Sequence, residues 1–437
     1  MKKNIVLVLA VSILFTLLAG CDGSGDENPK NETFEQLPET DKLVLYRHVN
    51  NKYLLDPAIK IFEKTYPDVE IEVRDFGDDL ETYMKTIQTE IPAGKGPDLI
   101  CSDGYEFPDI YKTMEADVFY DLNGIIENDP GFDIGDYNKV VLDSGVYKGK
   151  RYVMPISYRT RILITSEERL AEEGIKSNSL KTFGGYASEV KKYLDKYNST
   201  KLVYHVQYQW CLMYFPWCGL RAVDYESKSV NVGGDDFKKV MEAYKDIYWQ
   251  DIEAPDPIFS PEDEITIGLF QANEILFICS GAWYLDLQIC DRLSEIGHSP
   301  VFLPFPAASG KTTAKVENMA EILNSSQNKA NAYAFLKILL SEQIQGGADP
   351  SNVNFIWVPV LNSAVDLHVE YHSRERPKEE VEKCCAMSTD VKDCQIFSTK
   401  LTNDIFYQNM WPYFKGEETY ENCVNKTRNE LELYMSE

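Results

Sequence analysis

Apolar and polar positions after about residue 41 alternate between the period of strands and the period of helices. Apolar residues cluster at 42–49 and 97–101 and alternate with charges at 69–73, which predicts three strands. Between them, Asp56-Pro57 predicts a helix start, and residues 80–87 carry apolar positions at helical spacing. The order strand, helix, strand, helix, strand predicts an α/β domain with a mostly parallel sheet.

The rest of the chain continues with strands and helices and shows no internal repeat. The extended run 151–165 contains Pro155, which suits a segment that crosses between domains better than a central strand. About 400 residues exceed what one hydrophobic core usually organises, so we expect two domains. Residues 202–217 form a strongly aromatic stretch. Further patterns predict short strands at 276–280 and 301–305, and helices at 167–197, 237–247, 329–340 and 420–435.

The first 40 residues have a different character. Met1-Lys2-Lys3 precedes an apolar stretch and then Leu18-Ala19-Gly20-Cys21, after which the chain turns polar. This pattern is typical of an export signal, and the apolar part is shorter than the about 20 residues of a membrane-spanning helix. The segment ending at Cys21 resembles the lipobox of bacterial lipoproteins. The resemblance implies a signal peptide at 1–20 and lipidation of Cys21. The polar composition up to about residue 40, without an apolar period, predicts a flexible tether at 21–40.

The net charge and the cysteine content argue against several classes of function. The formal net charge of -26 argues against binding to nucleic acids or anionic lipids. Nine of the ten cysteines follow Cys21, and buried thiols are the favoured interpretation for most of them, with one or two disulfides as the alternative. Cys384, Cys385 and Cys394 do not have the spacing of a zinc module, so we expect no metal and no cofactor.

Several short segments, taken in order, resemble family 1 extracellular solute-binding proteins, the lipoprotein components of ABC importers for sugars and related solutes. No single segment is specific, but their order and spacing extend over essentially the whole chain after the tether. The matching segments are Gly94-Lys95-Gly96-Pro97-Asp98, Gly149-Lys150-Arg151-Tyr152 with Pro155, Gly174-Ile175, Phe270-Gln271-Ala272-Asn273-Glu274 leading to Ser280-Gly281-Ala282-Trp283, Leu303-Pro304-Phe305-Pro306, Asn324 to Lys329, and Trp357 to Ser363.

The resemblance implies a two-lobe, periplasmic-binding-protein-like α/β fold of the class II type, with the ligand in the cleft between the lobes. The implied lobes are 41–156 plus 270–325 and 157–269 plus 326–437. About three crossing segments would form the hinge, near 156–158, 269–270 and 325. The segments Leu180 to Gly184 and Ile164-Thr165 depart from the family pattern, which leaves the class of ligand open.

Candidate ligand-binding residues follow from the rule that ligands lie beyond the carboxyl ends of strands in open α/β sheets. A sugar needs polar groups for its hydroxyl edges and aromatic planes for its C–H faces. Each candidate also has an ordinary structural interpretation, such as a core aromatic or a pairing of Asp103 with Arg47. The candidates are Arg47, His48, Asn50, Ser102, Asp103, Tyr158, Arg159, Trp210, Trp217, Trp283 and Trp357, of which Trp283 is the favoured stacking platform.

Motifs for catalysis are incomplete. Ser309-Gly310-Lys311-Thr312 lacks the first glycine of a phosphate-binding loop, because that position is Phe305. His368 and His372 are spaced for a metal on a helix, yet the intervening glutamate is not where a zinc protease needs it. We therefore predict no enzyme activity.

The predicted function is that of a monomeric, extracytoplasmic binding protein, anchored in the bacterial membrane through lipid on Cys21. It would deliver a small solute, a mono- or oligosaccharide, to ABC permease subunits. The alternatives are a non-sugar solute, a ligand sensor that reports to another protein, and a lipid-anchored hydrolase.

Overall fold

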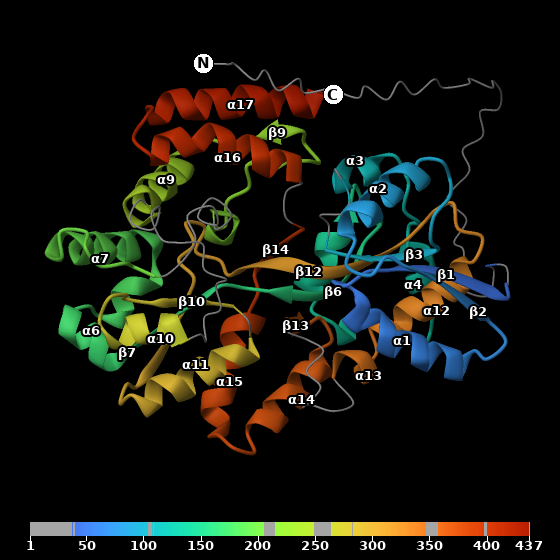
Figure 1. The fold of residues 1–437 in the computed structure, drawn as a ribbon, viewed down its shortest axis with the longest axis horizontal. Coiled ribbons are helices and arrows are strands. Elements are labelled where there is room, and N and C mark those ends of the chain that lie inside the picture. Colours follow the sequence, from blue (N-terminus) through green and yellow to red (C-terminus); the bar gives the residue numbers. More distant parts are fainter. Residues whose placement is uncertain are drawn as a thin grey trace.

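The computed structural model describes residues 37, 40–103, 107, 109–204, 215–248, 264–281, 283–346, 357–396 and 400–436. Two sheets organise two lobes, which lie side by side with long strands running between them (Figure 1). No helix in these ranges has both the length and the apolar character needed to cross a membrane. The predicted signal peptide, Cys21 and most of the tether lie outside the described residues.

The larger sheet has seven strands in the order β13-β6-β12-β3-β1-β2, with β14 beside β12. Strands β1, β2 and β3 are parallel, whereas β12 runs antiparallel to β3 and β6. The strands are β1 (Lys42–Arg47), β2 (Glu70–Asp75), β3 (Leu99–Ser102), β6 (Met154–Arg159), β12 (Thr313–Ile322), β13 (Val358–Pro359) and β14 (Asp393–Gln395). The α/β prediction and the parallel pairing of the first three strands are confirmed, whereas the prediction of a mostly parallel sheet is wrong because β12 and β13 pair antiparallel to their neighbours β3 and β6.

All ten residues of β12 are buried, because β6 covers one edge while β14 and β3 share the other. Helices cover the faces of this sheet. Helix α12 packs on α1, with the rings of Phe62 and Phe335 5.7 Å apart. The helices on this side are α1 (Lys52–Thr65), α2 (Leu80–Glu90), α3 (Ile110–Glu115), α4 (Asn123–Glu127), α5 (Lys139–Leu142), α12 (Lys329–Leu339) and α13 (Glu342–Gln345), with 3₁₀ turns η2 (Ile134–Asp136) and η3 (Asp143–Gly145).

The smaller sheet has the order β10-β7-β11, all antiparallel, with β7 (Ile162–Ser166) in the middle. The remaining strands are β10 (Ile278–Ser280), β11 (Pro300–Pro304) and the two hairpins β4 (Val146–Tyr147) with β5 (Lys150–Arg151) and β8 (Val223–Asp224) with β9 (Ser229–Val230). The remaining helices are α6 (Glu167–Glu173), η4 (Ser177–Lys181), α7 (Phe183–Lys196), η5 (Phe215–Cys218), α9 (Asp235–Tyr248), α10 (Glu264–Gln271), α11 (Tyr284–Glu295), α14 (Asn362–His372), α15 (Lys378–Thr389), α16 (Lys400–Phe414) and α17 (Tyr420–Ser436).

Local chemistry explains several of these boundaries. Ser166 caps α6 because its side chain accepts a hydrogen bond from Arg169 N, and Gly174 ends the helix with a positive φ of 68°. The predicted start of α1 at Asp56-Pro57 is wrong, because the helix begins at Lys52 and Pro57 lies inside it. Leu54 and Leu55 are buried in the core, and this burial outweighs the hydrogen bond that the proline forfeits.

Strand pairing also differs from the predicted division into lobes. Residues 278–280 and 300–304 pair with β7 in the smaller sheet, although they fall in the range 270–325 that was assigned to the first lobe. Conversely, α12 packs against α1 and β1, although its residues were assigned to the second lobe. If each lobe is defined by its sheet, the chain passes from the lobe of the smaller sheet to that of the larger sheet between β11 and β12.

Candidate functional site

Three charged side chains meet where β6 and β12 cross between the lobes. Arg159 pairs with Lys315 in the strand register, and Glu317 lies two residues further along β12. The Nε atom of Arg159 lies 2.6 Å from Oε1 of Glu317, and Nζ of Lys315 lies 3.5 Å from Oε2. The side chains of Lys315 and Glu317 are less than 10% exposed, at 6% and 9%. One carboxylate therefore holds two cations on the neighbouring strands β6 and β12.

Aromatic planes flank this cluster. The guanidinium carbon of Arg159 lies 4.6 Å from the ring centre of Trp357 and 5.5 Å from that of Trp217. Arg161, which follows in the crossing segment, lies 4.9 Å from the ring of Trp217. Trp217 is buried and Trp357 is half-buried.

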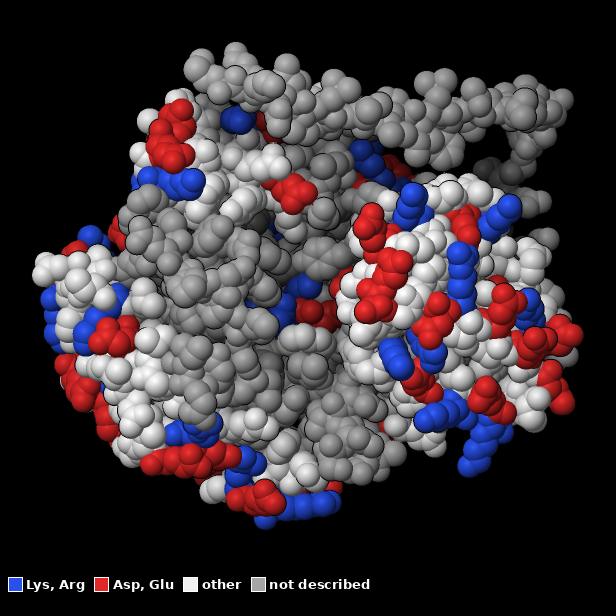
Figure 2. Space-filling model, viewed as in Figure 1, with Lys and Arg blue, Asp and Glu red and all other residues white. Residues whose placement is uncertain are grey.

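Figure 2 shows basic and acidic side chains together in the hollow between the two lobes.

A polar group from the first lobe joins the cluster at Asn318. The hydroxyls of Tyr53 and Ser157 both donate to Oδ1 of Asn318, at 2.5 and 2.8 Å. The strand register shifts on both sides of Asn318, so β12 is irregular at this point. Burial raises the pKa of Tyr53, and the negative charges of Glu317 and Asp103 add to this shift, so the phenol stays a hydrogen-bond donor.

Residues His48 and Asp103 lie at the carboxyl ends of β1 and β3, as the strand-end rule predicts. The ring of His48 is buried 4.2 Å from that of Tyr83. Burial lowers the pKa of His48 to about 4, and the charge of Asp103 opposes this shift only in part. His48 is therefore a neutral ring at neutral pH.

Three other candidates have structural partners. Ser102 is buried and its hydroxyl donates to Glu321 at 2.9 Å. Arg47 forms ion pairs of 2.6 Å with Asp56 and with Asp75, rather than the suggested pair with Asp103. The backbone N–H of Asn50, an exposed turn residue, donates to Nδ1 of His48 at 3.3 Å.

Tyr158 and Trp283 are more deeply buried than a ligand platform needs. Tyr158 neighbours Arg159 in β6, so its side chain points to the opposite face, where its hydroxyl accepts a hydrogen bond from Asn138. Trp283 is 3% exposed and meets His368 edge-on, with ring centres 5.0 Å apart. Trp210 lies outside the described residues.

The sequence interpretation missed Lys315, Glu317, Asn318, Tyr53 and Arg161. A signal for the first two was present, since Lys315 and Glu317 stand at alternate positions on either side of Val316. His368 and His372 stack with their ring centres 6.2 Å apart. Within the described ranges, no three His, Cys, Asp or Glu side chains are grouped so as to hold a metal ion.

A protein-family model gives an independent view of this arrangement. The model described as "Bacterial extracellular solute-binding protein" matches residues 48–346, which is more than half of the chain. No curated protein matches the sequence closely enough to count as a relative.

Solved structures share the fold. The sugar-binding protein MalE from Xanthomonas citri superposes with a TM-score of 0.69 at 15% identity, over 90% of this chain and 97% of that one. A putative oligosaccharide periplasmic-binding protein from Synechococcus gives 0.65 at 15% identity, over 90% and 99%. Lmo0181 from Listeria monocytogenes, in complex with cycloalternan, gives 0.60 at 17% identity, over 90% and 99%. The family match and the two-lobe architecture agree, and the chain belongs to the bacterial extracellular solute-binding proteins.

Proposed function

We propose that this protein binds a mono- or oligosaccharide in the cleft between its lobes and delivers it to the permease of an ABC importer. The observation that carries the proposal is the cluster of Arg159, Lys315 and Glu317 beside the indole rings of Trp217 and Trp357. The names of the similar structures support it, since they describe a sugar-binding protein and a complex with cycloalternan.

The chemistry of the cluster suits a polyhydroxylated ligand. Charged hydrogen-bonding groups recognise hydroxyl groups strongly, and indole faces pack against the weakly polar C–H faces of a sugar ring. Asn318 and Tyr53 supply neutral amide and phenol groups from the first lobe. A ligand that engages both Trp357 and Tyr53 would contact groups held by different parts of the molecule.

Two connections between the sheets, which lie beside the cluster, support a hinge there. Residues 160–161 join β6 to β7, and 305–312 join β11 to β12, so the two sheets are linked by segments beside the cluster. A ligand that binds the closed form more tightly than the open form shifts the population toward closure, and a few kcal/mol suffices. The closed shape would be the form that the permease recognises.

A calorimetric and thermal-shift screen tests the sugar assignment. Mono- and oligosaccharides are compared with amino acids, polyamines and metal ions, and a ligand at about 100 times its Kd adds about 2.7 kcal/mol of stability. Trp357→Ala and Glu317→Gln should weaken sugar binding at least tenfold, since each removes a contact of order 1–3 kcal/mol. Trp411→Ala, in α16, is the matched control and should leave the affinity unchanged. Stabilisation by control compounds alone would overturn the carbohydrate assignment while keeping the binding role.

Delivery to a permease is tested in the producing cell. Deletion of the gene should abolish high-affinity uptake of the identified sugar. If uptake continues while a transcriptional response to the sugar disappears, the protein is a sensor component instead. Hydrolysis of a chromogenic glycoside by the purified protein would revive the hydrolase alternative.

The lipid anchor is part of the same proposal. The segment Leu18-Ala19-Gly20-Cys21 supports attachment of diacylglycerol to the Cys21 thiol, which would hold the protein on the extracytoplasmic face of the membrane. Cys21→Ser should move the protein from the membrane fraction to the soluble fraction. Retention of the variant in the membrane fraction would contradict lipidation at this residue.

A further inference from the structure

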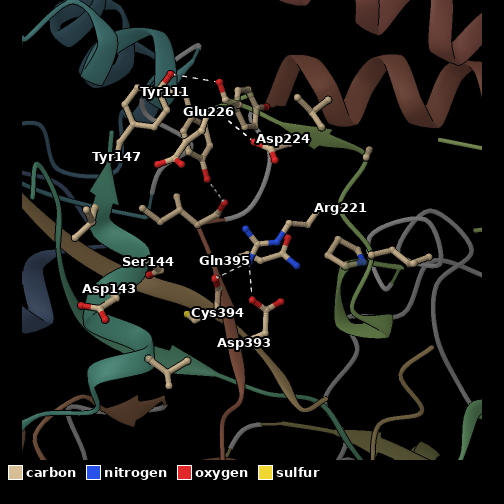
Figure 3. A pocket seen from close by; sticks show the side chains of 18 of the residues that line it. Tyr111, Asp143, Ser144, Tyr147, Arg221, Asp224, Glu226, Asp393, Cys394 and Gln395 are labelled. Atoms are coloured by element: carbon tan, nitrogen blue, oxygen red, sulfur yellow. Dashed lines mark hydrogen bonds and ion pairs between the residues drawn. The ribbon is translucent and has the colours of Figure 1, made fainter. Parts of the chain in front are cut away.

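A second cavity lies at the free edge of β14, apart from the charged cluster. Its volume is about 470 Å³, which is within the range of small-molecule sites. One side is formed by α3, η3 and β4, and the other by the segment 220–226 and β14 (Figure 3). None of Arg159, Lys315, Glu317 and Trp357 lines this space.

Gln395 lines the cavity and has a buried side-chain donor without a partner. The residue is only 9% exposed, and its Nε2 atom has no hydrogen-bond partner within the described part of the chain. The backbone of Gln395 is fixed by pairing with Lys315 of β12, so the amide position is determined by the sheet. A buried donor without an acceptor costs about 1–3 kcal/mol, and a ligand oxygen would remove that cost.

Arg221 places a guanidinium beside this amide. Its Nη2 atom lies 2.6 Å from Oδ1 of Asp393 and 3.4 Å from the carbonyl oxygen of Cys394, so the group is held by two neighbours of Gln395. Figure 3 shows the side chains of Arg221 and Gln395 meeting in the middle of the cavity. Together they present convergent donors to an occupant.

The charges that line the cavity are largely paired already. Asp143 pairs with Lys139 and Arg151, and the two cations of the lining, Arg221 and Lys392, pair with Asp393 and Asp390. Because both cations of the lining are engaged by carboxylates, an anion is disfavoured. A bare cation leaves the Gln395 donor without a partner. A neutral molecule with several hydroxyl groups satisfies both the donors and the carboxylates.

Aromatic rings close one end of the cavity. Tyr111 of α3 and Tyr225 of the β8–β9 hairpin stack with ring centres 3.9 Å apart and planes within 8°. The hydroxyl of Tyr111 also donates to the carbonyl of Ile396, which follows Gln395. The wall is therefore anchored to the same strand as the unsatisfied amide.

We propose that this cavity is a second binding site, specific for a small neutral polyol and separate from the cluster of Arg159, Lys315 and Glu317. One wall of the cavity comes from α3 and its neighbours, and the other comes from the β8–β9 hairpin and β14. The occupant therefore contacts both walls. The proposal is independent of which solute the cleft binds.

Hydrogen–deuterium exchange of the purified protein tests the site with trehalose, sucrose and sorbitol as probes. Spermidine and glutamate serve as charged controls. A polyol should slow exchange in the segments 144–147, 221–226 and 393–396. Gln395→Leu and Arg221→Met should each weaken the affinity for that polyol about tenfold, the loss expected for one buried hydrogen bond. Glu317→Gln, in the cleft, should leave this protection intact.

Each other outcome overturns the proposal. Protection confined to 157–161 and 315–318 would place every polyol in the cleft and would leave the proposed function standing. Protection of the cavity segments that neither Gln395→Leu nor Arg221→Met weakens would place the ligand elsewhere. Protection by spermidine or glutamate alone would show that the site selects charge, and no protection by any probe would show that it binds no polyol.

Discussion

Arg159 Nε and Glu317 Oε1 lie 2.6 Å apart, on two neighbouring strands that both lead toward the smaller sheet. Lys315 approaches the other oxygen of the same carboxylate. Glu317 therefore neutralises two cations that are otherwise removed from water, and its loss leaves both without this partner.

Glu317→Gln should lower the free energy of unfolding by about 3 kcal/mol, because two cations in a buried cluster lose the negative charge that they share. Urea unfolding at neutral pH measures the change. The control is Asp195→Asn, which removes an exposed ion pair with Lys191 and should cost less than about 0.5 kcal/mol. Equal effects of the two variants would show that the buried cluster contributes no special stability.

Stability should decrease at acidic pH through buried histidines. Burial lowers the pKa of His48 and of His368 to about 4, and burial lowers that of His372 as well. The unfolded chain has histidines near the ordinary pKa of about 6.5, so it binds more protons than the folded protein between these values. Stability is thus fully present above about pH 6.5 and falls toward pH 4, by up to about 1.4 kcal/mol per pH unit for each histidine.

Thermal unfolding across this pH range measures the slope. His48→Asn and His368→Phe should each flatten it, because each removes one group that takes up a proton on unfolding. A slope that both variants leave unchanged would assign the acid sensitivity to the carboxylates instead.

Trp283→Ala should affect stability more than ligand binding. The side chain is 3% exposed and packs edge-on against His368, so truncation creates a core cavity and costs about 3 kcal/mol. Trp357→Ala, at a half-buried ring beside Arg159, should show the reverse, a large loss of affinity with a small change in melting temperature. If Trp283→Ala abolishes binding while the melting temperature stays the same, Trp283 is the stacking platform that the sequence suggested.

Gly281→Ala should disturb the connection between the lobes. A Cβ atom at this position would lie 2.0 Å from the carbonyl oxygen of Thr160, which belongs to the segment joining β6 to β7. Either the strand end or the crossing segment must move, so we expect a loss of at least about 1 kcal/mol together with altered ligand affinity. Gly184→Ala, where nothing lies within 4 Å, is the matched control. Unchanged stability and affinity in Gly281→Ala would contradict this close contact.

Thiol reactivity should report global unfolding. The eight described cysteines are buried thiols, and burial raises the pKa of Cys218, Cys385 and Cys394 to about 12. Iodoacetamide reacts with thiolates, so labelling of these three should be slow in the folded protein and rapid in urea. Mass spectrometry of labelled peptides measures this difference. Rapid labelling of any of the three under native conditions would indicate local opening.

Local patterns predicted the elements that depend on nearby residues. The strand at 42–49 is β1, and the helices at 329–340 and 420–435 are α12 and α17, because each has a regular apolar period and clear ends. The start of α1 was wrong because burial of Leu54 and Leu55, a tertiary effect, competes with the local proline signal.

The site depended on pairings that no local pattern contains. Arg159 was among the candidates, but its partners Lys315 and Glu317 come from a strand more than 150 residues later. Tyr53 reaches Asn318 over an even longer separation. The pairing of β10 and β11 with β7, rather than with the strand that follows them, was missed for the same reason.

The position of β14 has a consequence for synthesis of the chain. The larger sheet contains strands from residue 42 to residue 395, and β14 covers one edge of β12 at 313–315. Because a chain is made from its N-terminus, this sheet cannot be complete until about nine-tenths of the protein has emerged. A chain that ends before residue 393 would leave the edge of β12 without its partner, and an unpaired edge is a template for association with other chains. Premature termination late in the gene should therefore yield aggregated protein rather than a smaller functional one.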